Sequence, residues 1–256
     1  MNRLQQILSS RPLTVDEIAG TFDHALLAPV LTDRDMRIDL RAVRKYPLAS
    51  VCIKPAAVAL AIEELAETEI AVCTVIGFPQ GSNLSSVKAF EADQALKSGA
   101  KEVDMVVNIG KVLGEDWDYV RSDIEAVSDV TRAYGGILKV IFETDYVVAD
   151  RLKIRLCEIC SELKVDYVKT STGFGFVVNA QKLISYSGAT EHDVRLMREH
   201  CPPEVGIKAS GGIRSLESVL KFIELGCTRI GLSATKSILE SVASRELDAK
   251  SEHSGY

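Results

Sequence analysis

Two lysine residues end short apolar segments, where a charged side chain is unexpected. Lys169 closes the segment 165–169 and precedes hydroxyl residues and a glycine at 170–173, and Lys208 stands in an almost identical setting within 205–212. Moving an ammonium group out of water is costly unless the group is paired or neutralised. We therefore expect chemistry, rather than solubility, to account for these two lysines.

The chemistry that such a pair favours is imine formation. An amine attacks a carbonyl carbon only when it is unprotonated, and a free lysine at neutral pH is nearly all ammonium. Burial and a second ammonium nearby both lower the pKa of a lysine. Two lysines in one cavity are thus typical of a Schiff-base nucleophile, and a nearby carboxylate can move the protons.

Asp104 and Lys139 lie in further apolar segments and are candidates for the same cavity. Strand side chains alternate in direction, so the sequence does not determine which residues face inward. Lys139 could point outward between helices, and Asp104 could pair with a lysine only to hold the fold together. Two lysines and an aspartate on nearby segments favour the functional interpretation.

Eight short β-branched segments alternate with helical patterns along the chain. The segments are centred near Phe22, Val51, Thr74, Met105, Val140, Val168, Ile207 and Ile230. Their nearly continuous apolarity is typical of parallel strands covered on both faces. We predict an α/β fold with a single domain over 1–256, a (β/α)8 TIM barrel, because eight such units close a barrel. A doubly wound open sheet is the alternative, but no G-x-G-x-x-G follows the first segment.

Cap residues bound the expected helices. Thr32 with Asp35 and Thr190 with Asp193 open two of them, and helices from Ser85 and Ser215 end at Gly99 and Gly226, respectively. Residues 1–20 are expected to form an N-terminal helical extension with a capping box at Thr14 and Glu17. The segment 175–188 exceeds a typical loop of this class and could be a lid or a decorated loop. Residues 241–256 are polar and are expected to form a flexible C-terminal tail.

Glycines follow the last two predicted strands. Gly211 and Gly212 come after the seventh, and Gly231 with Ser233 comes at the eighth. In barrels these loops, with a helix N-terminus such as the one near Ser215, commonly bind a phosphate group. The same glycines could instead mark ordinary tight turns.

Composition excludes several classes of function. The chain has 256 residues, 46% of them hydrophobic, and a net charge of −6, which does not fit a nucleic-acid-binding surface. No apolar run approaches the roughly 18 residues of a membrane span, and the N-terminus lacks a secretory signal. We expect a cytoplasmic protein without nucleic-acid or membrane partners.

Cysteine and histidine usage predicts neither disulfides nor a metal centre. The six cysteines are scattered, and most suit reduced, buried thiols. Cys157 and Cys160 could form a redox pair, but they fall within a helical pattern. The four histidines show no paired metal-ligand spacing, so neither a metal site nor a cofactor is expected.

Five motifs resemble those of 2-deoxyribose-5-phosphate aldolases, a family of class I aldolases, over about residues 22–239. They are Phe22-Asp23-His24-Ala25-Leu26-Leu27, Glu102-Val103-Asp104-Met105-Val106-Val107-Asn108, Leu138-Lys139-Val140-Ile141-Phe142-Glu143-Thr144, Tyr167-Val168-Lys169-Thr170-Ser171-Thr172-Gly173 and Ile207-Lys208-Ala209-Ser210-Gly211-Gly212-Ile213-Arg214. The last two motifs are highly specific, and their order along the chain adds weight.

The resemblance implies a role for each matching residue. Lys169 would form the imine, Lys208 would lower its pKa, and Asp104 would join the proton relay. The phosphate-cradling positions would be Gly173, Gly211, Gly212, Gly231 and Ser233. Supporting roles would fall to Lys139, Asp23, Cys52 and the terminal Tyr256, which some members swing into the site. The implied partner is a small phosphorylated sugar, and we expect a homodimer.

The sequence also departs from the family pattern. Ala25 and Ala28 replace a threonine and a lysine that are frequent in members, Phe174 stands where some carry lysine, and the segment 175–188 is long. Three functions are therefore kept open. They are cleavage of 2-deoxy-D-ribose 5-phosphate to glyceraldehyde 3-phosphate and acetaldehyde, a related Schiff-base aldolase with another aldehyde donor or acceptor, and a non-catalytic barrel that binds a sugar phosphate.

Overall fold

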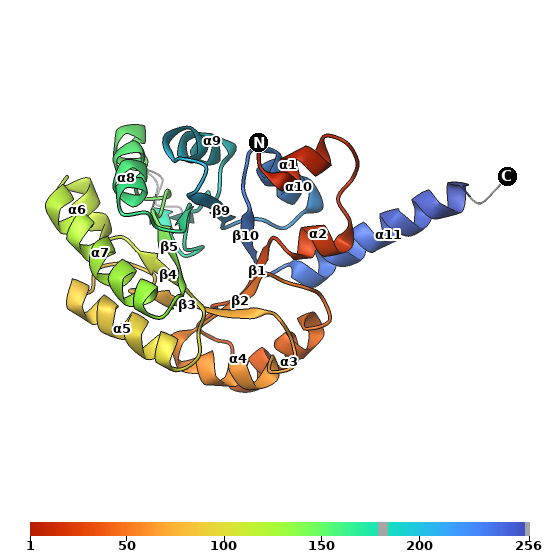
Figure 1. Cartoon of the computed structure of the whole chain (residues 1–256), viewed down its shortest axis with the longest axis horizontal. Helices are drawn as coiled ribbons and strands as arrows, with labels where there is room; N and C mark the ends of the chain where they lie inside the picture. The colour runs from red at the N-terminus through yellow and green to blue at the C-terminus, as the bar shows by residue number, and fades with distance from the viewer. Residues whose placement is uncertain (179–183, 254–256) are drawn as a thin grey trace.

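A closed barrel of eight parallel strands forms the centre of the computed structural model, which describes residues 1–178 and 184–253 (Figure 1). The order around the barrel is β1, β10, β9, β6, β5, β4, β3 and β2. The strand bounds are β1 Phe22–Leu26, β2 Ser50–Ile53, β3 Ala71–Ile76, β4 Glu102–Val106, β5 Ile137–Ile141, β6 Tyr167–Lys169, β9 Gly206–Ser210 and β10 Arg229–Leu232. The predicted (β/α)8 barrel is confirmed, and each of the eight expected segments supplies one strand.

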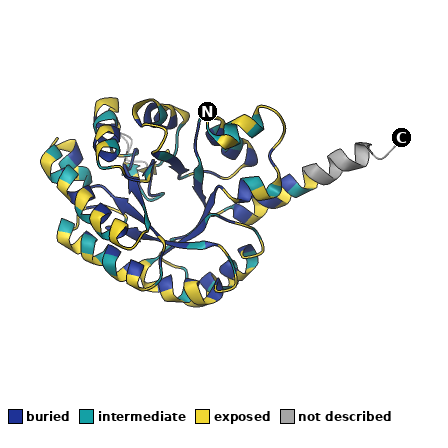
Figure 2. Ribbon diagram, viewed as in Figure 1, coloured by how far each residue is buried: buried dark blue, intermediate teal, exposed yellow. Residues whose placement is uncertain are grey.

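The strands are buried along almost their whole length because both of their faces are covered. In β2 and β4 every residue is buried, and Figure 2 shows the buried inner ring surrounded by helices that expose only their outer faces. Apolar side chains between strands and helices make one connected core, to which Leu40, Ile124 and Leu156 contribute fully buried side chains. This explains why the strand segments read as continuous apolar runs.

The helices follow the strands around the outside of the barrel. Their bounds are α3 Asp33–Val43, the 3₁₀ helix η1 Pro55–Ala57, α4 Val58–Glu64, α5 Ser85–Lys97, α6 Ile109–Leu113, α7 Trp117–Ala133, α8 Asp150–Glu162, α9 Glu191–His200, α10 Leu216–Glu224 and α11 Thr235–His253. Three of the expected N-caps are present, but Ser85 is the first residue of α5, whose N-cap Leu84 makes no side-chain hydrogen bond. Thr32 and Asp35 form a capping box, and Thr190 and Ser215 accept from the backbone N–H of the residue three positions on.

The two ends of the chain are helical. The N-terminal extension consists of α1 (Arg3–Leu8) and α2 (Val15–Ala19), and the predicted capping box of Thr14 and Glu17 opens α2. At the other end α11 continues to His253 and leaves the barrel beside α2 (Figure 1). The segment that we expected to be a flexible tail from residue 241 is therefore helical as far as His253.

The segment 175–188 contains a two-stranded antiparallel hairpin, separate from the barrel. Its strands are β7 (Val177–Val178) and β8 (Ile184–Ser185), and the turn between them lies outside the described residues. The hairpin stands after β6, at the end of the barrel where the strands finish. It is therefore placed beside the loops that carry function in this fold.

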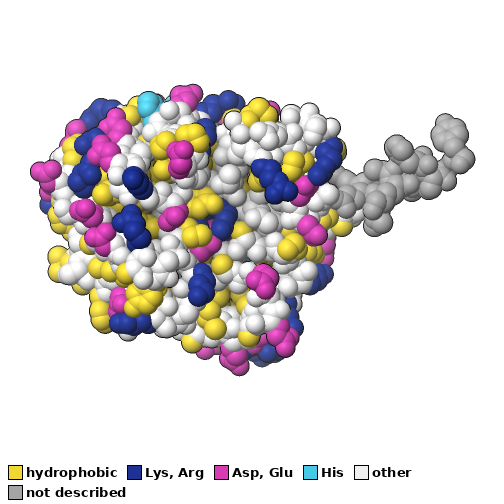
Figure 3. Space-filling model, viewed as in Figure 1, with side chains coloured by type: hydrophobic (Ala, Val, Ile, Leu, Met, Phe, Trp, Pro, Cys, Tyr) yellow, Lys and Arg dark blue, Asp and Glu magenta, His cyan; other side chains and the backbone are white. Residues whose placement is uncertain are grey.

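The surface and the thiols fit the composition. On the face drawn in Figure 3, acidic and basic side chains are interspersed rather than gathered into one basic patch. No helix among the described residues is long and apolar enough to cross a membrane. All six cysteines are free and buried, so the Cys157 and Cys160 thiols of α8 do not form a disulfide.

Candidate active site

Four neighbouring strands bring the charged candidates into the barrel interior. Lys169 of β6 lies in register with Lys208 of β9, and Asp104 of β4 lies in register with Lys139 of β5. All four side chains are buried, with at most 3% of each residue exposed. Lys139 therefore points into the barrel and not outward between helices.

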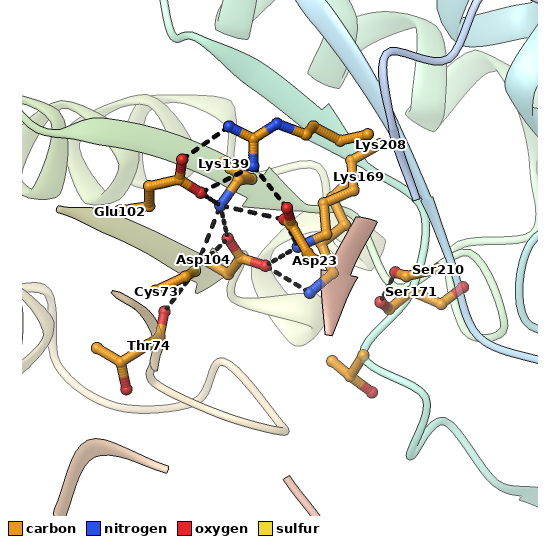
Figure 4. A network of polar contacts seen from close by, with 12 residues as sticks. Asp23, Cys73, Thr74, Glu102, Asp104, Lys139, Lys169, Ser171, Lys208 and Ser210 are labelled. Atoms are coloured by element: carbon orange, nitrogen blue, oxygen red, sulfur yellow. Dashed lines mark hydrogen bonds and ion pairs between the residues drawn. The ribbon is translucent and has the colours of Figure 1, made fainter. Parts of the chain in front are cut away.

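Asp104 joins the two lysines that the sequence singled out. Its Oδ2 accepts from Lys169 Nζ at 2.7 Å and from Lys208 Nζ at 2.7 Å (Figure 4). Its Oδ1 accepts from Lys139 Nζ at 2.8 Å. The two amines thus share one cavity and one carboxylate oxygen.

A second set of ion pairs supports this arrangement from the start of the strands. Asp23 Oδ2 accepts from Lys208 Nζ at 2.5 Å, and Asp23 Oδ1 accepts from Arg229 at 2.5 Å. Glu102 accepts from Arg229 at 2.7 Å and from Lys139 at 2.6 Å. Asp23 therefore has the supporting position that the resemblance implied.

The sequence reading missed Glu102 and Arg229, although both carried a signal. Glu102 stands two residues before Asp104 in the same strand and therefore faces the same side. Arg229 is paired in register with Lys208. In each case the signal is a charged residue that begins a mostly apolar strand.

The charges of this network are unequal in number. Among the described residues, Lys139, Lys208 and Arg229 each contact at least two of the carboxylates Asp23, Glu102 and Asp104, whereas Lys169 contacts Asp104 alone. Four cationic side chains thus face three carboxylates. The network is electrically balanced when the amine of Lys169 is neutral, which is the form that attacks a carbonyl.

The remaining groups are held in their charged forms. Burial alone lowers the pKa of Lys208, but attraction to Asp104 and Asp23 outweighs it and raises this pKa above its usual value. Burial likewise lowers the pKa of Lys139, and the nearby Asp104 and other acidic groups raise it well above normal. For Asp104 burial raises the pKa, yet the three lysines bring it well below the usual range.

Two thiols border the carboxylate. Cys73 Sγ donates to Asp104 Oδ1 at 3.2 Å and accepts from Lys139 Nζ at 3.3 Å. The donor atoms of Cys52, Cys73 and Asp104 lie within 4.8 Å of one another, which is close enough for a shared metal ion. The residues do not fit one, because three lysine amines already contact Asp104, and the ammonium groups of Lys139 and Lys208 would repel a cation.

A cavity of about 410 Å³ opens above the network, at the end of the barrel where the strands finish. Lys169, Lys208, Asp23 and Cys52 line its floor. Its walls include Gly173, Gly211, Gly212, Gly231 and Ser233, together with Arg214 and Tyr186, which the sequence reading did not single out. Ala25, Ala28 and Phe174, the three departures from the family pattern, also line this cavity.

The glycines of the wall have two different roles. Gly173, Gly211 and Gly212 adopt φ values of 87°, 96° and 75° in the turns after β6 and β9, a conformation that favours glycine. Gly231 lies within β10, where a methyl group would stand 3.1 Å from Lys208 Cε and 2.8 Å from Ser210 Cβ. Gly231 therefore makes room for the lysine, whereas the other three shape turns whose N–H groups can face an anion.

A buried glutamate fixes the turn after β6. Glu143 has a φ of 54°, an uncommon conformation for a residue with a side chain. Its carboxylate accepts from the hydroxyl of Thr172 and from the Thr172 backbone N–H at 3.3 Å. Burial raises the pKa of Glu143. Glu143 and Thr172 both stand in motifs of the resemblance, but the sequence analysis predicted no contact between them.

One candidate remains outside this geometry. Tyr256 is not among the described residues, so its expected approach to the site stays a prediction. The hairpin of segment 175–188 does reach the site, because Tyr186 lines the cavity.

Comparison with known proteins agrees with the motifs. Residues 20–235 match the model of the DeoC/LacD family aldolases. A deoxyribose-phosphate aldolase of Enterococcus faecalis is 45% identical over 223 residues, 87% of this chain and 96% of that protein. One of Lactococcus lactis is 43% identical over 230 residues, 90% of this chain and 99% of that protein.

Solved structures show the same relationship. A putative deoxyribose-phosphate aldolase from Coccidioides immitis superposes with a TM-score of 0.82 at 34% identity, covering 91% of this chain and 87% of that one. The deoxyribose phosphate aldolase of Aeropyrum pernix gives 0.80 at 28% identity, covering 94% and 97%.

Proposed function

Since the chain belongs to the DeoC/LacD family of aldolases, we propose that it cleaves 2-deoxy-D-ribose 5-phosphate reversibly to D-glyceraldehyde 3-phosphate and acetaldehyde through an imine on Lys169. The observation that carries the proposal is the shared oxygen of Asp104, which holds Lys169 and Lys208 in one cavity. Lys169 has the fewest carboxylate contacts of the cations in the network, so it is the amine best able to be neutral.

The reaction begins with covalent activation. Lys169 Nζ adds to C1 of the open-chain sugar, and loss of water gives the iminium ion. A base then takes the proton of the C3 hydroxyl as the C2–C3 bond breaks, and the bonding electrons move into the iminium to form an enamine. Protonation of the enamine at C2 and hydrolysis release acetaldehyde and restore the free amine.

Asp104 and Lys208 supply the proton relay in this proposal. The carboxylate of Asp104 stays ionised, because its pKa lies well below the usual range. In this proposal it orients the neighbouring amines and holds a transferred proton only briefly. Lys208 stays an ammonium, because nearby Asp104 and Asp23 raise its pKa, and it places a positive charge beside the amine of Lys169. The fixed charges are preorganised for the charge changes of the reaction.

Reductive trapping tests the proposal. The protein is incubated with deoxyribose 5-phosphate and borohydride, and its peptides are mapped by mass spectrometry. We expect one adduct, on the peptide that carries Lys169, and loss of both adduct and turnover in Lys169→Met. A protein that is active but forms no adduct, or one only on Lys208, would contradict the assignment. The matched control is Lys153→Met, which removes a buried lysine outside the cavity.

A panel of aldehydes and phosphorylated sugars separates this function from the two alternatives. Preference for another donor or acceptor would indicate a related Schiff-base aldolase with a pocket reshaped around Ala25, Ala28 and Phe174. Sugar-phosphate binding without any turnover would favour the non-catalytic barrel.

A further inference from the structure

The hairpin after β6 places a tyrosine beside the glycine turns that line the cavity. Tyr186 directly follows β8, and its side chain lines the same cavity as Lys169 and Arg214. Its ring packs against the ring of Phe176 with centroids 5.8 Å apart. The tyrosine is therefore part of the site although it comes from a segment outside the barrel.

Several bonds hold this hairpin in place. The carboxylate of Asp145 accepts from the backbone N–H groups of Ser187 at 2.7 Å and Gly188 at 3.0 Å. The hydroxyl of Tyr146 donates to the carbonyl of Phe176 at 2.9 Å. These contacts hold the backbone that follows Tyr186 and the backbone of Phe176, whose ring packs against Tyr186.

The hydroxyl of Tyr186 stands over the glycine turns. A methyl group on Gly211 would lie 2.3 Å from Tyr186 Oη, and one on Gly173 would lie 3.7 Å from it. A methyl group on Gly212 would lie 3.8 Å from Cε1 of the same tyrosine ring. The oxygen therefore lies between the turns after β6 and β9, both of which face the cavity.

This hydroxyl has a proton to donate. Burial, with Asp145 and Glu143 nearby, raises the pKa of Tyr186 to about 12, so the phenol is neutral at physiological pH. Tyr186 is half-buried beside the cavity, and an anion bound between the glycine turns would accept the proton of its hydroxyl.

We propose that Tyr186 is a binding residue for the phosphate group of the substrate, donating its hydroxyl proton to a phosphate oxygen held between the turns of Gly173 and Gly211–Gly212. The inference rests on the proposed function for the identity of the substrate but not for the binding of the anion. In this proposal the hairpin supplies a neutral donor, the hydroxyl of Tyr186, to the phosphate site. The guanidinium of Arg214 lines the same cavity.

Tyr186→Phe tests the proposal, because it removes only the donated proton and keeps the ring. A hydrogen bond to a charged group predicts a rise of about 10- to 100-fold in KM for deoxyribose 5-phosphate, with little change in kcat. The kcat/KM for unphosphorylated deoxyribose should stay unchanged. An equal loss with both sugars, no change with either, or a fall in KM for the phosphorylated sugar would overturn the proposal.

Two further measurements separate this site from the aldolase reaction and from the hairpin itself. Titration calorimetry with inorganic phosphate should show the same weakening in Tyr186→Phe, and equal affinity in both proteins would overturn the proposal. If the intact protein cleaves no deoxyribose 5-phosphate but phosphate binding still depends on Tyr186, the proposed function fails and this site stands. Tyr146→Phe removes a bond that anchors the hairpin but keeps the Tyr186 hydroxyl, and it should weaken phosphate binding much less than Tyr186→Phe. A loss equal to that of Tyr186→Phe would assign the effect to hairpin docking and refute the proposal.

Discussion

Replacing Lys208 with methionine tests whether its positive charge keeps the neighbouring amine reactive. Lys169 and Lys208 both donate to Asp104 Oδ2 at 2.7 Å, so their nitrogen atoms are close together. Two unit charges about 5 Å apart at an effective dielectric constant of about 20 repel by ~3 kcal/mol. At 25 °C this energy corresponds to roughly a hundredfold change in an equilibrium or rate constant.

The expected result is a slower reaction and not a loss of the nucleophile. In Lys208→Met the amine of Lys169 loses the cationic neighbour with which it shares Asp104 Oδ2. Borohydride trapping at Lys169 should slow about a hundredfold at pH 7. The assay is the initial rate of adduct formation between pH 6 and pH 10.

Stability has to be measured beside the rate. Removing one partner of a buried ion pair costs about 3–5 kcal/mol, and we expect the lower end because Asp23 and Asp104 keep other partners. Lys153→Met is the matched control. Lys153 is also a buried lysine between two aspartates, Asp193 at 2.5 Å and Asp150 at 2.9 Å, but it lies on α8 outside the barrel. A folded Lys208→Met protein whose trapping rate and pH profile match the intact enzyme would refute the reasoning.

Two further predictions follow from the same network. Gly231→Ala should displace Lys208 and cost about 1–3 kcal/mol of unfolding free energy, measured by urea denaturation, because the added methyl would stand 3.1 Å from Lys208 Cε and 2.8 Å from Ser210 Cβ. Asp23 and Asp104 have folded-state pKa values below their unfolded ones, so the stability that they contribute is present above about pH 4 and is lost as the pH falls through the folded values. Acid titration of the unfolding free energy should therefore show a steeper loss below pH 4 in the intact protein than in Asp104→Asn, and equal slopes would contradict this assignment.

Local sequence signals were sufficient for the barrel and for the centre of the site. Apolar runs and cap residues such as Thr32 and Ser215 depend on contacts within a few residues, so they can be read without the tertiary structure. The expectation that Lys169, Lys208 and Asp104 meet rested on the motifs and on the common reaction face of a closed barrel. The structure confirms that these three side chains meet.

Residues whose roles depend on register and insertion were not predictable in the same way. Glu102 and Arg229 meet only because the barrel closes between strands that are distant in sequence. The role of Gly231 depends on its place beside the stem of Lys208. Tyr186 reaches the cavity through a hairpin whose packing is not encoded in the alternation of strands and helices. In each case long-range geometry, which no local pattern contains, decides the contact.

The arrangement also explains why the cations of the inner site are lysines. Asp104 has a short side chain and stands on β4, whereas Lys169 and Lys208 come from β6 and β9, on the other side of β5. Only long, flexible side chains can bring two cations from those strands to one carboxylate oxygen. An arginine could span the same distance, but its guanidinium does not give up its proton and cannot form an imine. Reach therefore requires a long cation at both positions, and the imine that we propose on Lys169 requires that this one be a lysine.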